Sequence, residues 1–325
     1  MPSKDRVLVY ALVSESWESG SDPKRVTSYR RGVRRLCTTL TAVLILIAGC
    51  ATGNEPTNPP GNEHPPIGKV DSYVALGDSF VSGPGIDQVD PASKDCQRSN
   101  RNYPTLLSMA LKTRTFADVS CAGASTIHIL DGANSLDGTP VPPQLDAISA
   151  DTQLVTVGIG ANNSLVLVGL LSTCRAGTRD QYDRCAKFVR DQMPRLLKAG
   201  SADVVRALDA IARKAPRARI VLVSYLRVVP EAGACPAAGF QRQHVALVSK
   251  GEKLLDASQA DAAKEAGVDY VSLSKMSRGH DACAGSKAWV NALKPPKGDG
   301  AILHPNAAGM RAAADAVADH LRKND

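Results

Sequence analysis

Short apolar runs rich in Val and Ile alternate with helix-like segments after residue 70, and this alternation constrains the fold more than any other feature. The runs span 72–77, 116–123, 154–160, 219–226 and 268–274. Longer stretches with helical spacing of apolar residues span 182–215, 244–267 and 306–323. Strands of this kind separated by helices form a parallel sheet that is covered on both faces. The sequence therefore predicts one α/β domain over residues 70–325, a three-layer α/β/α sandwich around a central parallel sheet.

Three of the predicted strands end in residues suited to chemistry. Ser79 follows the first run, Gly123 closes the second, and Asn162 follows the third. In a parallel α/β sheet, ligands bind in the crevice beyond the carboxyl ends of the strands. We therefore expect a serine, a glycine and an asparagine from distant segments to meet at one edge of the sheet.

These residue types are the ones that ester hydrolysis requires. The Ser79 hydroxyl needs a base as it attacks, and the oxyanion that forms needs fixed N–H donors. The backbone N–H of Ser79, the backbone N–H of Gly123 and the side-chain amide of Asn162 could supply them. A glycine suits this place because an oxyanion can approach its backbone closely. Ser79 could instead merely cap a helix, and Asp78 before it reads as a turn residue rather than a catalytic one.

Among the six histidines, His304 is best placed to act as the base. It lies in a loop just before the last predicted helix, in "GDGAILHPNAAGM". Pro305 is suited to the first turn of that helix, and Asn306 could contribute to its cap. A histidine held at a helix start in this way can lean into the crevice.

Taken together, the four blocks resemble the SGNH, or GDSL-type, hydrolases. They read "GDSF" at Ser79, "SCAGAST" at Gly123, "GIGANN" at Asn162 and "LHPNAAG" at His304, in the order of the family. The resemblance covers nearly all of residues 70–325 and is strongest to the secreted actinobacterial lipases and esterases with three disulfides. It implies a flavodoxin-like fold and a serine esterase that uses no metal and no cofactor.

Two positions depart from the family pattern. The family often has Asp three residues before the histidine, where this chain has Ala301, so the resemblance implies a Ser79–His304 dyad. A backbone carbonyl near Ala301, or the carboxylate of Asp299, would then accept the imidazole N–H. The second departure is Asn163, where the family usually has Asp; we expect the local structure to survive because Asn keeps the shape and loses only the charge.

The sequence leaves the substrate and even the activity open. A lipid or fatty-acyl ester is the first choice, and an acetylated cell-envelope glycan is the second. A non-catalytic binding lipoprotein on the same fold is a third possibility, which Ala301 favours and the four intact blocks oppose. The apolar stretch 165–174 could line an acyl site, but a buried helix is the favoured interpretation.

The N-terminal segment indicates export. A basic stretch, Arg30–Arg35, precedes an apolar run of about a dozen residues, which is shorter than the roughly 20 that span a bilayer. The run ends in "IAGC", which resembles the lipobox of bacterial lipoproteins and implies removal of residues 1–49 and acylation of Cys50. Residues 50–69 would then be a disordered, Pro- and Gly-rich tether to the membrane. The alternative is an ordinary signal peptide and a product released to the medium or cell wall.

The charge of +7 fits the same interpretation, because much of it lies near the N-terminus. Only 4% of the residues are aromatic, which argues against a stacking surface for nucleic acid. The stretch before Arg30 is long for a signal peptide, so Val26 or Val33 could be the true first residue. Protein partners are not indicated.

Six cysteines remain after the export segment, an even number that favours disulfides in an exported chain. None has the C-x-x-C spacing of a zinc site or a redox motif. Many connectivities are open; we favour the sequential one, in which each bridge closes a segment without crossing another: Cys96–Cys121, Cys174–Cys185 and Cys235–Cys283.

Overall fold

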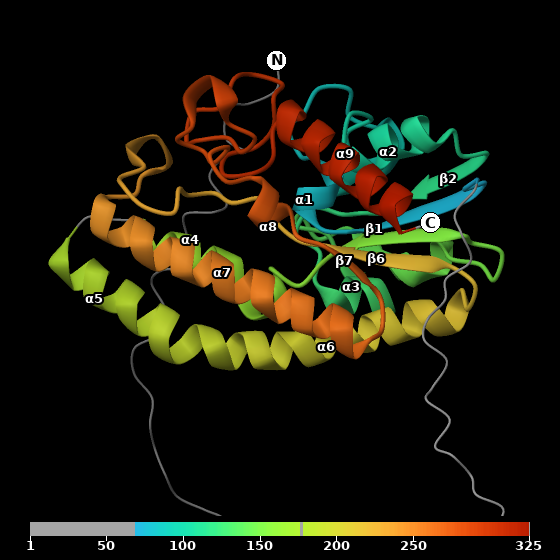
Figure 1. The fold of residues 1–325 in the computed structure, drawn as a ribbon, viewed down its shortest axis with the longest axis horizontal. Helices are drawn as coiled ribbons and strands as arrows, with labels where there is room; N and C mark the ends of the chain where they lie inside the picture. The colour runs from blue at the N-terminus through green and yellow to red at the C-terminus, as the bar shows by residue number, and fades with distance from the viewer. Residues whose placement is uncertain (1–68, 176–177, 325) are drawn as a thin grey trace, which may run out of the picture. The chain divides into compact units, whose positions relative to one another are not determined.

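A computed structural model describes residues 69–175 and 178–324. Its five parallel strands form one sheet in the order β2-β1-β5-β6-β7, shown in Figure 1. The strands are β1 (Ser72–Gly77), β2 (Thr115–Asp118), β5 (Leu154–Gly158), β6 (Arg219–Val223) and β7 (Asp269–Val271). This is the 2-1-3-4-5 order of flavodoxin-like folds, whose strand order reverses between the first and third strands. The predicted fold is confirmed, and the point of reversal lies between β1 and β5.

Alternating side chains of the strands bury both faces of the sheet. In β1, Tyr73 and Ala75 belong to one buried apolar cluster, whereas Val74 and Leu76 belong to another. Successive strand residues point to opposite faces, so apolar residues at every position require cover on both sides. Each fully buried aliphatic side chain contributes about 1.5–3 kcal/mol, which makes this double burial the main stabilisation of the sheet.

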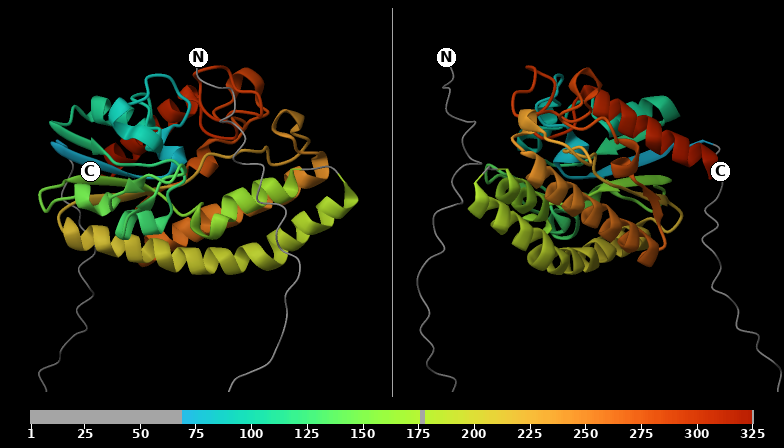
Figure 2. Two further views of the ribbon diagram at one scale, coloured as in Figure 1. Left: turned by 180° about the vertical axis from the view of Figure 1, so that it is seen from behind. Right: turned by 60° about the vertical axis from the view of Figure 1, so that its left-hand side comes forward.

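Helices supply the cover, as Figures 1 and 2 show. On one face lie α2 (Tyr103–Leu111) and the C-terminal α9 (Ala307–Lys323). On the other lie α3 (Thr126–Leu130) and α6 (Met193–Lys214), with α7 (Arg242–Glu265) packed alongside α6. The result is the three-layer arrangement expected from the sequence.

The long helix predicted over 182–215 is divided in the structure. Helix α5 (Arg179–Lys187) is followed by a π-helical turn, Phe188–Gln192, before α6 begins at Met193. Pro194 explains the break, because it has no N–H to continue the i→i−4 ladder and its ring clashes with the preceding turn. The π turn lets the chain remain helical around this proline.

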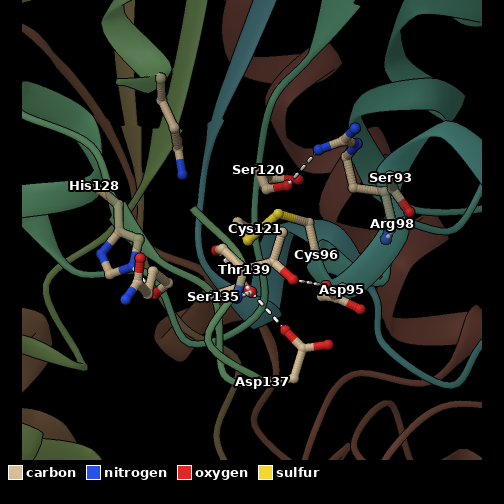
Figure 3. The surroundings of a disulfide bond; sticks show 12 residues. Ser93, Asp95, Cys96, Arg98, Ser120, Cys121, His128, Ser135, Asp137 and Thr139 are labelled. Carbon is tan, nitrogen blue, oxygen red and sulfur yellow. Dashed lines mark hydrogen bonds between the residues drawn. A yellow bond between two sulfur atoms is a disulfide. The ribbon is translucent and has the colours of Figure 1, made fainter. Parts of the chain in front are cut away.

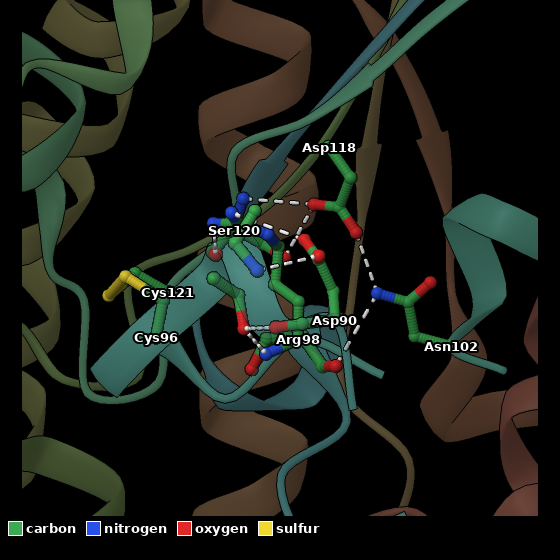
Figure 4. Close-up of polar contacts among 10 residues, drawn as sticks. Asp90, Cys96, Arg98, Asn102, Asp118, Ser120 and Cys121 are labelled. Carbon is green, nitrogen blue, oxygen red and sulfur yellow. Dashed lines mark hydrogen bonds and ion pairs between the residues drawn. A yellow bond between two sulfur atoms is a disulfide. The ribbon is translucent and has the colours of Figure 1, made fainter. Parts of the chain in front are cut away.

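The second strand is shorter than predicted, because β2 stops at Asp118 rather than Gly123. The Asp118 carboxylate accepts hydrogen bonds from the N–H of Ser120 at 2.9 Å and from its hydroxyl at 2.6 Å. It also accepts one from the side-chain amide of Asn102 at 2.6 Å, as Figure 4 shows. These bonds turn the chain out of the sheet and begin the segment that leads to Gly123.

The apolar stretch after Asn163 forms α4 (Val166–Cys174), whose buried residues are Val166, Leu167, Leu170 and Cys174. The favoured interpretation of this stretch as a buried helix is therefore confirmed. The structure also contains the short helices α1 (Ser79–Ser82) and α8 (Leu273–Met276), and a hairpin of β3 (Ala133–Asn134) with β4 (Pro140–Val141). Short 3-10 helices lie at Pro91–Cys96, Gln144–Ala147, Asn163–Leu165, Pro236–Ala238 and Gly285–Lys287.

Three disulfides form in the sequential pattern: Cys96–Cys121, Cys174–Cys185 and Cys235–Cys283. The first, shown in Figure 3, ties the loop after α1 to the segment after β2.

The predicted signal, Cys50 and most of the tether lie outside the described residues. Within residues 69–175 and 178–324, no helix is long and apolar enough to cross a bilayer.

Candidate active site

Ser79 lies at the first turn of α1, directly beyond the carboxyl end of β1. Asp78 caps this helix, and its Oδ1 accepts the Phe80 N–H at 2.9 Å. Gly77 makes the sharp exit from the strand possible. A Cβ at Gly77 would lie 2.3 Å from a methyl group of Val81 and 2.6 Å from the carbonyl of Gly158, so no other residue fits. The sequence therefore folds locally so that the serine hydroxyl is presented at the edge of the sheet.

The structure brings His304 into hydrogen-bond contact with Ser79, although 225 residues separate them. His304 Nε2 lies 2.9 Å from Ser79 Oγ, and Nδ1 lies 2.8 Å from the carbonyl oxygen of Ile302. A carbonyl can only accept, so Nδ1 carries the proton and the Nε2 lone pair faces the hydroxyl. Burial lowers the pKa of His304 below its ordinary value, and the bond to Ile302 partly opposes this shift. The imidazole is therefore neutral and basic at neutral pH.

The loop before His304 is held against the loop that follows α1. Ala301 N–H donates to the Pro84 carbonyl at 2.8 Å, and Gly300 N–H donates to the Gly85 carbonyl at 3.1 Å. On the other side of the histidine, Asn306 caps α9 by accepting the Gly309 N–H at 2.9 Å, as the sequence suggested. Both ends of the histidine loop are thus anchored.

Asp299, one of the two acceptors considered for the His304 N–H, does not fill that place. Its Oδ1 accepts the backbone N–H of Ala307 at 3.0 Å and so stabilises the first turn of α9. The acceptor is the backbone carbonyl of Ile302, immediately after Ala301. The structure thus decides between the two alternatives in favour of a backbone carbonyl.

The loops of Gly123 and Asn162 meet beside this pair. Cys121 N–H donates to the carbonyl of Gly77 at 3.0 Å, which fixes the glycine block to the end of β1. The Asn162 side-chain amide donates to the carbonyl of Ala124 at 2.9 Å, and its second N–H has no partner among the residues that the structure describes. Gly123 has φ +81°, a left-handed conformation that favours glycine. Ser79, Gly123, Asn162 and His304 are all half-buried, so the site is open to solvent.

The departure at Asn163 leaves the local structure intact, as expected. Its Oδ1 accepts the backbone N–H of Thr126 at 3.1 Å and the Thr126 hydroxyl at 3.3 Å. Its Nδ2 donates to the carbonyl of Gly200 at 3.4 Å, a bond that an aspartate could not make. The amide therefore joins the asparagine block to both α3 and α6.

Tyr225 is a site residue that the sequence analysis did not single out. Its buried hydroxyl donates to Asp78 Oδ2 at 2.5 Å and accepts the backbone N–H of Ala161 at 3.0 Å. Burial raises the pKa of Asp78 to about 7, while the bonds from Tyr225 and Phe80 oppose the shift. Tyr225 lies at the end of the fourth apolar run, so the strand-end rule that found Ser79 and Asn162 could also have found it.

Phe80 packs between these groups. Its ring centroid lies 5.0 Å from that of Tyr225, edge to face, and 5.1 Å from that of His304. Phe80 therefore contacts both the tyrosine and the proposed base through its ring. Among the described residues, no group of three or more His, Cys, Asp or Glu is arranged to hold a metal ion.

Comparison with known proteins gives a consistent picture. Residues 75–312 match the model of the GDSL-like lipase/acylhydrolase family. Lipase 2 of Streptomyces coelicolor is 33% identical over 266 residues, which cover 77% of this chain and 85% of that protein. The crystal structure of phospholipase A1 from Streptomyces albidoflavus has a TM-score of 0.63 at 25% identity, covering 77% of this chain and 99% of that one. That of an extracellular lipase from Streptomyces rimosus has a TM-score of 0.62 at 25% identity, covering 76% and 98%.

Proposed function

Since the chain belongs to the GDSL-like lipase/acylhydrolase family and is an ester hydrolase, we propose that Ser79 is its nucleophile and His304 its general base. The observation that carries this proposal is the 2.9 Å contact between His304 Nε2 and Ser79 Oγ, with Nδ1 committed to the Ile302 carbonyl. Ser79 Oγ attacks the ester carbonyl as Nε2 takes its proton. The imidazolium then returns that proton to the leaving alcohol, and water hydrolyses the acyl-enzyme by the reverse proton route.

The Ile302 carbonyl orients the imidazole and stabilises its charged form. A neutral carbonyl does this less strongly than a carboxylate would, because hydrogen bonds between charged groups are roughly twice as strong. The dyad therefore depends more on the geometry of the histidine loop than a Ser-His-Asp triad does. The bonds from Ala301 and Gly300 to the loop after α1 support that geometry.

We assign the oxyanion hole to the backbone N–H groups of Ser79 and Gly123 and to the side chain of Asn162. The free N–H of the Asn162 amide and the left-handed backbone of Gly123 support this assignment. Asn162→Ala should lower kcat by about 10²–10³-fold with little change in KM, because a donor of this kind acts mainly in the transition state.

The nucleophile is tested by p-nitrophenyl butyrate hydrolysis and by labelling with a fluorophosphonate probe. The parent should turn over the ester and label covalently, whereas Ser79→Ala should do neither. Equal rates for the two proteins would remove the assignment of Ser79. A parent that neither labels nor hydrolyses any ester would favour the non-catalytic binding lipoprotein instead.

Exposed apolar side chains near the site favour a fatty-acyl substrate over an acetylated glycan. Leu136 is 55% exposed, and its Cδ2 would lie 2.6 Å from a Cβ placed on Gly123. Ile302, whose carbonyl holds His304, is 43% exposed. Leu165, whose N–H donates to the Asn162 carbonyl at 3.0 Å, is 59% exposed. Apolar surface of this kind suits a hydrocarbon chain and offers no hydrogen-bonding groups to a sugar.

The turn that carries Leu136 is anchored rather than free, as Figure 3 shows for Ser135, Asp137, Thr139 and Asp95. The Ser135 hydroxyl donates to Asp137 at 2.7 Å, and the Thr139 hydroxyl donates to Asp95 at 2.6 Å. The backbone of Leu136 is therefore held beside the glycine block, while its side chain stays exposed. This anchoring supports its role as a contact for the acyl chain.

A chain-length series of p-nitrophenyl esters tests the acyl class. The octanoate should exceed the acetate in kcat/KM, since each methylene in apolar contact is worth about 0.8 kcal/mol, or about fourfold. Leu136→Asn should reduce this preference while acetate hydrolysis is kept, and the matched control Met109→Asn, exposed on α2, should not. If the parent hydrolyses an acetylated sugar faster than every p-nitrophenyl ester of the series, this result would favour the deacetylase.

We also propose that residues 1–49 direct export and that Cys50 is acylated and anchors the domain through the tether 50–69. The basic stretch, the apolar run and "IAGC" support this, as does the extracellular location named for the Streptomyces rimosus lipase. Fatty-acid labelling and fractionation of the parent and Cys50→Ala test it. The parent should carry the label in the membrane fraction and Cys50→Ala should carry none; an unlabelled parent would exclude the lipid anchor, and a parent retained inside the cell would exclude export.

A further inference from the structure

We infer that Tyr225 is a positioning residue for catalysis: its hydroxyl links the loop that carries Ser79 to the loop that carries Asn162. The inference rests on the proposed roles of Ser79 and Asn162. Tyr225 lies just beyond β6, buried at 6% exposure, and touches neither proposed reacting group through its hydroxyl. It acts through the residue that precedes each of them.

One oxygen atom makes both connections. Tyr225 Oη donates to Asp78 Oδ2 at 2.5 Å and accepts the Ala161 N–H at 3.0 Å. Asp78 immediately precedes Ser79, and Ala161 immediately precedes Asn162. These loops follow β1 and β5, the strands between which the order reverses. The hydroxyl thus sets the spacing between nucleophile and oxyanion donor from a third strand.

The direction of the two bonds requires an ionised Asp78. The N–H of Ala161 occupies the acceptor side of Tyr225 Oη, so the phenol proton is free to go to Asp78 Oδ2. Asp78 Oδ1 accepts the Phe80 N–H, so both carboxylate oxygens face donors. If Asp78 were protonated on Oδ2, two donors would point at Tyr225 Oη and the phenol proton would have no buried acceptor. Protonation therefore breaks the bridge.

The groups that face Asp78 leave this balance sensitive to pH. Tyr225, just beyond β6, and Tyr103, in α2, have pKa values raised by burial and stay neutral. His304 packs against Phe80, with ring centroids 5.1 Å apart, and is itself half-buried. Asp78 makes no ion pair within residues 69–175 and 178–324. With the pKa of Asp78 raised to about 7, the bridge forms as pH rises through neutrality.

Tyr225→Phe tests the bridge because it removes one oxygen and keeps the ring that packs on Phe80. We expect kcat for p-nitrophenyl butyrate to fall roughly 10- to 100-fold while KM stays within about twofold, since small displacements of aligned groups act on the chemical step. The matched control is Tyr270→Phe, whose hydroxyl donates to Asp256 at 2.6 Å, away from the four blocks. That variant should keep the parent kcat.

The pH profile separates positioning from simple loss of stability. In the parent, kcat/KM should decline below about pH 7 as Asp78 takes up its proton. Tyr225→Phe has no bridge left for this protonation to break, so the part of the decline that Asp78 causes should be absent from its profile. In Asp78→Asn the Asp78 titration should vanish, leaving only that of His304. If Tyr225→Phe does not fold, Asp78→Asn still provides this readout.

The outcomes separate the bridge from the dyad. An inactive Ser79→Ala with an unchanged kcat and pH profile in Tyr225→Phe would overturn the bridge alone. An equal loss in Tyr270→Phe, or an Asp78→Asn profile that matches the parent, would overturn it as well. An active Ser79→Ala would overturn the proposed dyad, whatever the tyrosine variants do.

Discussion

Gly123→Ala separates the proposed catalytic role of the glycine block from its structural role. Gly123 has φ +81°, and a left-handed conformation costs an L-residue roughly 1–2 kcal/mol. The new methyl group would also lie 2.6 Å from Leu136 Cδ2 and 2.8 Å from its Cγ. Leu136 is 55% exposed, so it can rotate towards solvent and the overlap adds little. We therefore expect a free energy of unfolding lower by only about 1–2 kcal/mol, or roughly 2–8 °C in melting temperature.

The effect on activity should be much larger. An oxyanion donor must lie within about 2.7–3.1 Å of the developing charge, and the loop relieves part of the alanine strain by a small shift that moves this N–H out of that range. Loss of one such donor lowers kcat by about 10²–10³-fold and leaves KM nearly unchanged. Steady-state hydrolysis of p-nitrophenyl butyrate measures both constants, and thermal unfolding followed by circular dichroism measures the stability.

A second substitution identifies the cause. Leu136→Ala in the Gly123→Ala background removes the steric overlap but not the backbone strain. The double variant should therefore stay within about threefold of the single variant in kcat. Recovery of the parent kcat would mean that a displaced Leu136 had blocked the site. A single variant with the parent kcat would show that the Gly123 N–H is not an oxyanion donor, and this result would refute the assignment.

Three further predictions concern the support of the dyad. Asp299→Asn should keep kcat within about twofold of the parent, whereas removal of the charge from a true triad acid costs roughly 10⁴-fold; steady-state rates decide between the two. Asn163→Asp should lower the free energy of unfolding by about 1–3 kcal/mol in urea, because the carboxylate loses the donor bond to the Gly200 carbonyl; equal or greater stability would contradict that contact. In Asp78→Asn, kcat/KM should fall with decreasing pH around a midpoint below the ordinary histidine value, because burial lowers the pKa of His304 and only the neutral imidazole accepts the serine proton; a midpoint above that value would contradict the burial argument.

The fold could be read from the sequence because its signals are local. Runs of Val and Ile bury both faces of a strand, and helical spacing marks the covering layers. The ends of the helices and strands were harder to predict from the sequence, because they depend on single residues and contacts. The Asp118 carboxylate ends β2 early by bonding Ser120, and Pro194 divides the predicted long helix. The first of these contacts depends on where a side chain turns, which a hydrophobic pattern does not record.

The candidate site could likewise be predicted only in part. Ser79, Gly123, Asn162 and His304 were named from residue type and from their place at strand ends or a helix start, and the structure brings Ser79 and His304 within 2.9 Å. The sequence left two acceptors open for the His304 N–H. The structure chose the Ile302 carbonyl because Asp299 is engaged with the N–H of Ala307.

By itself, the sequence determined the layered α/β architecture, the order of the four blocks and the type of chemistry that their side chains permit. These follow from periodic burial and from functional groups that each residue carries wherever it lies. Only the tertiary structure decided the direction of the imidazole hydrogen bonds and the bridge from Tyr225 to Asp78 and Ala161. Such bonds need donor and acceptor within about 3 Å of each other, and that distance is fixed by how loops from separate strands pack.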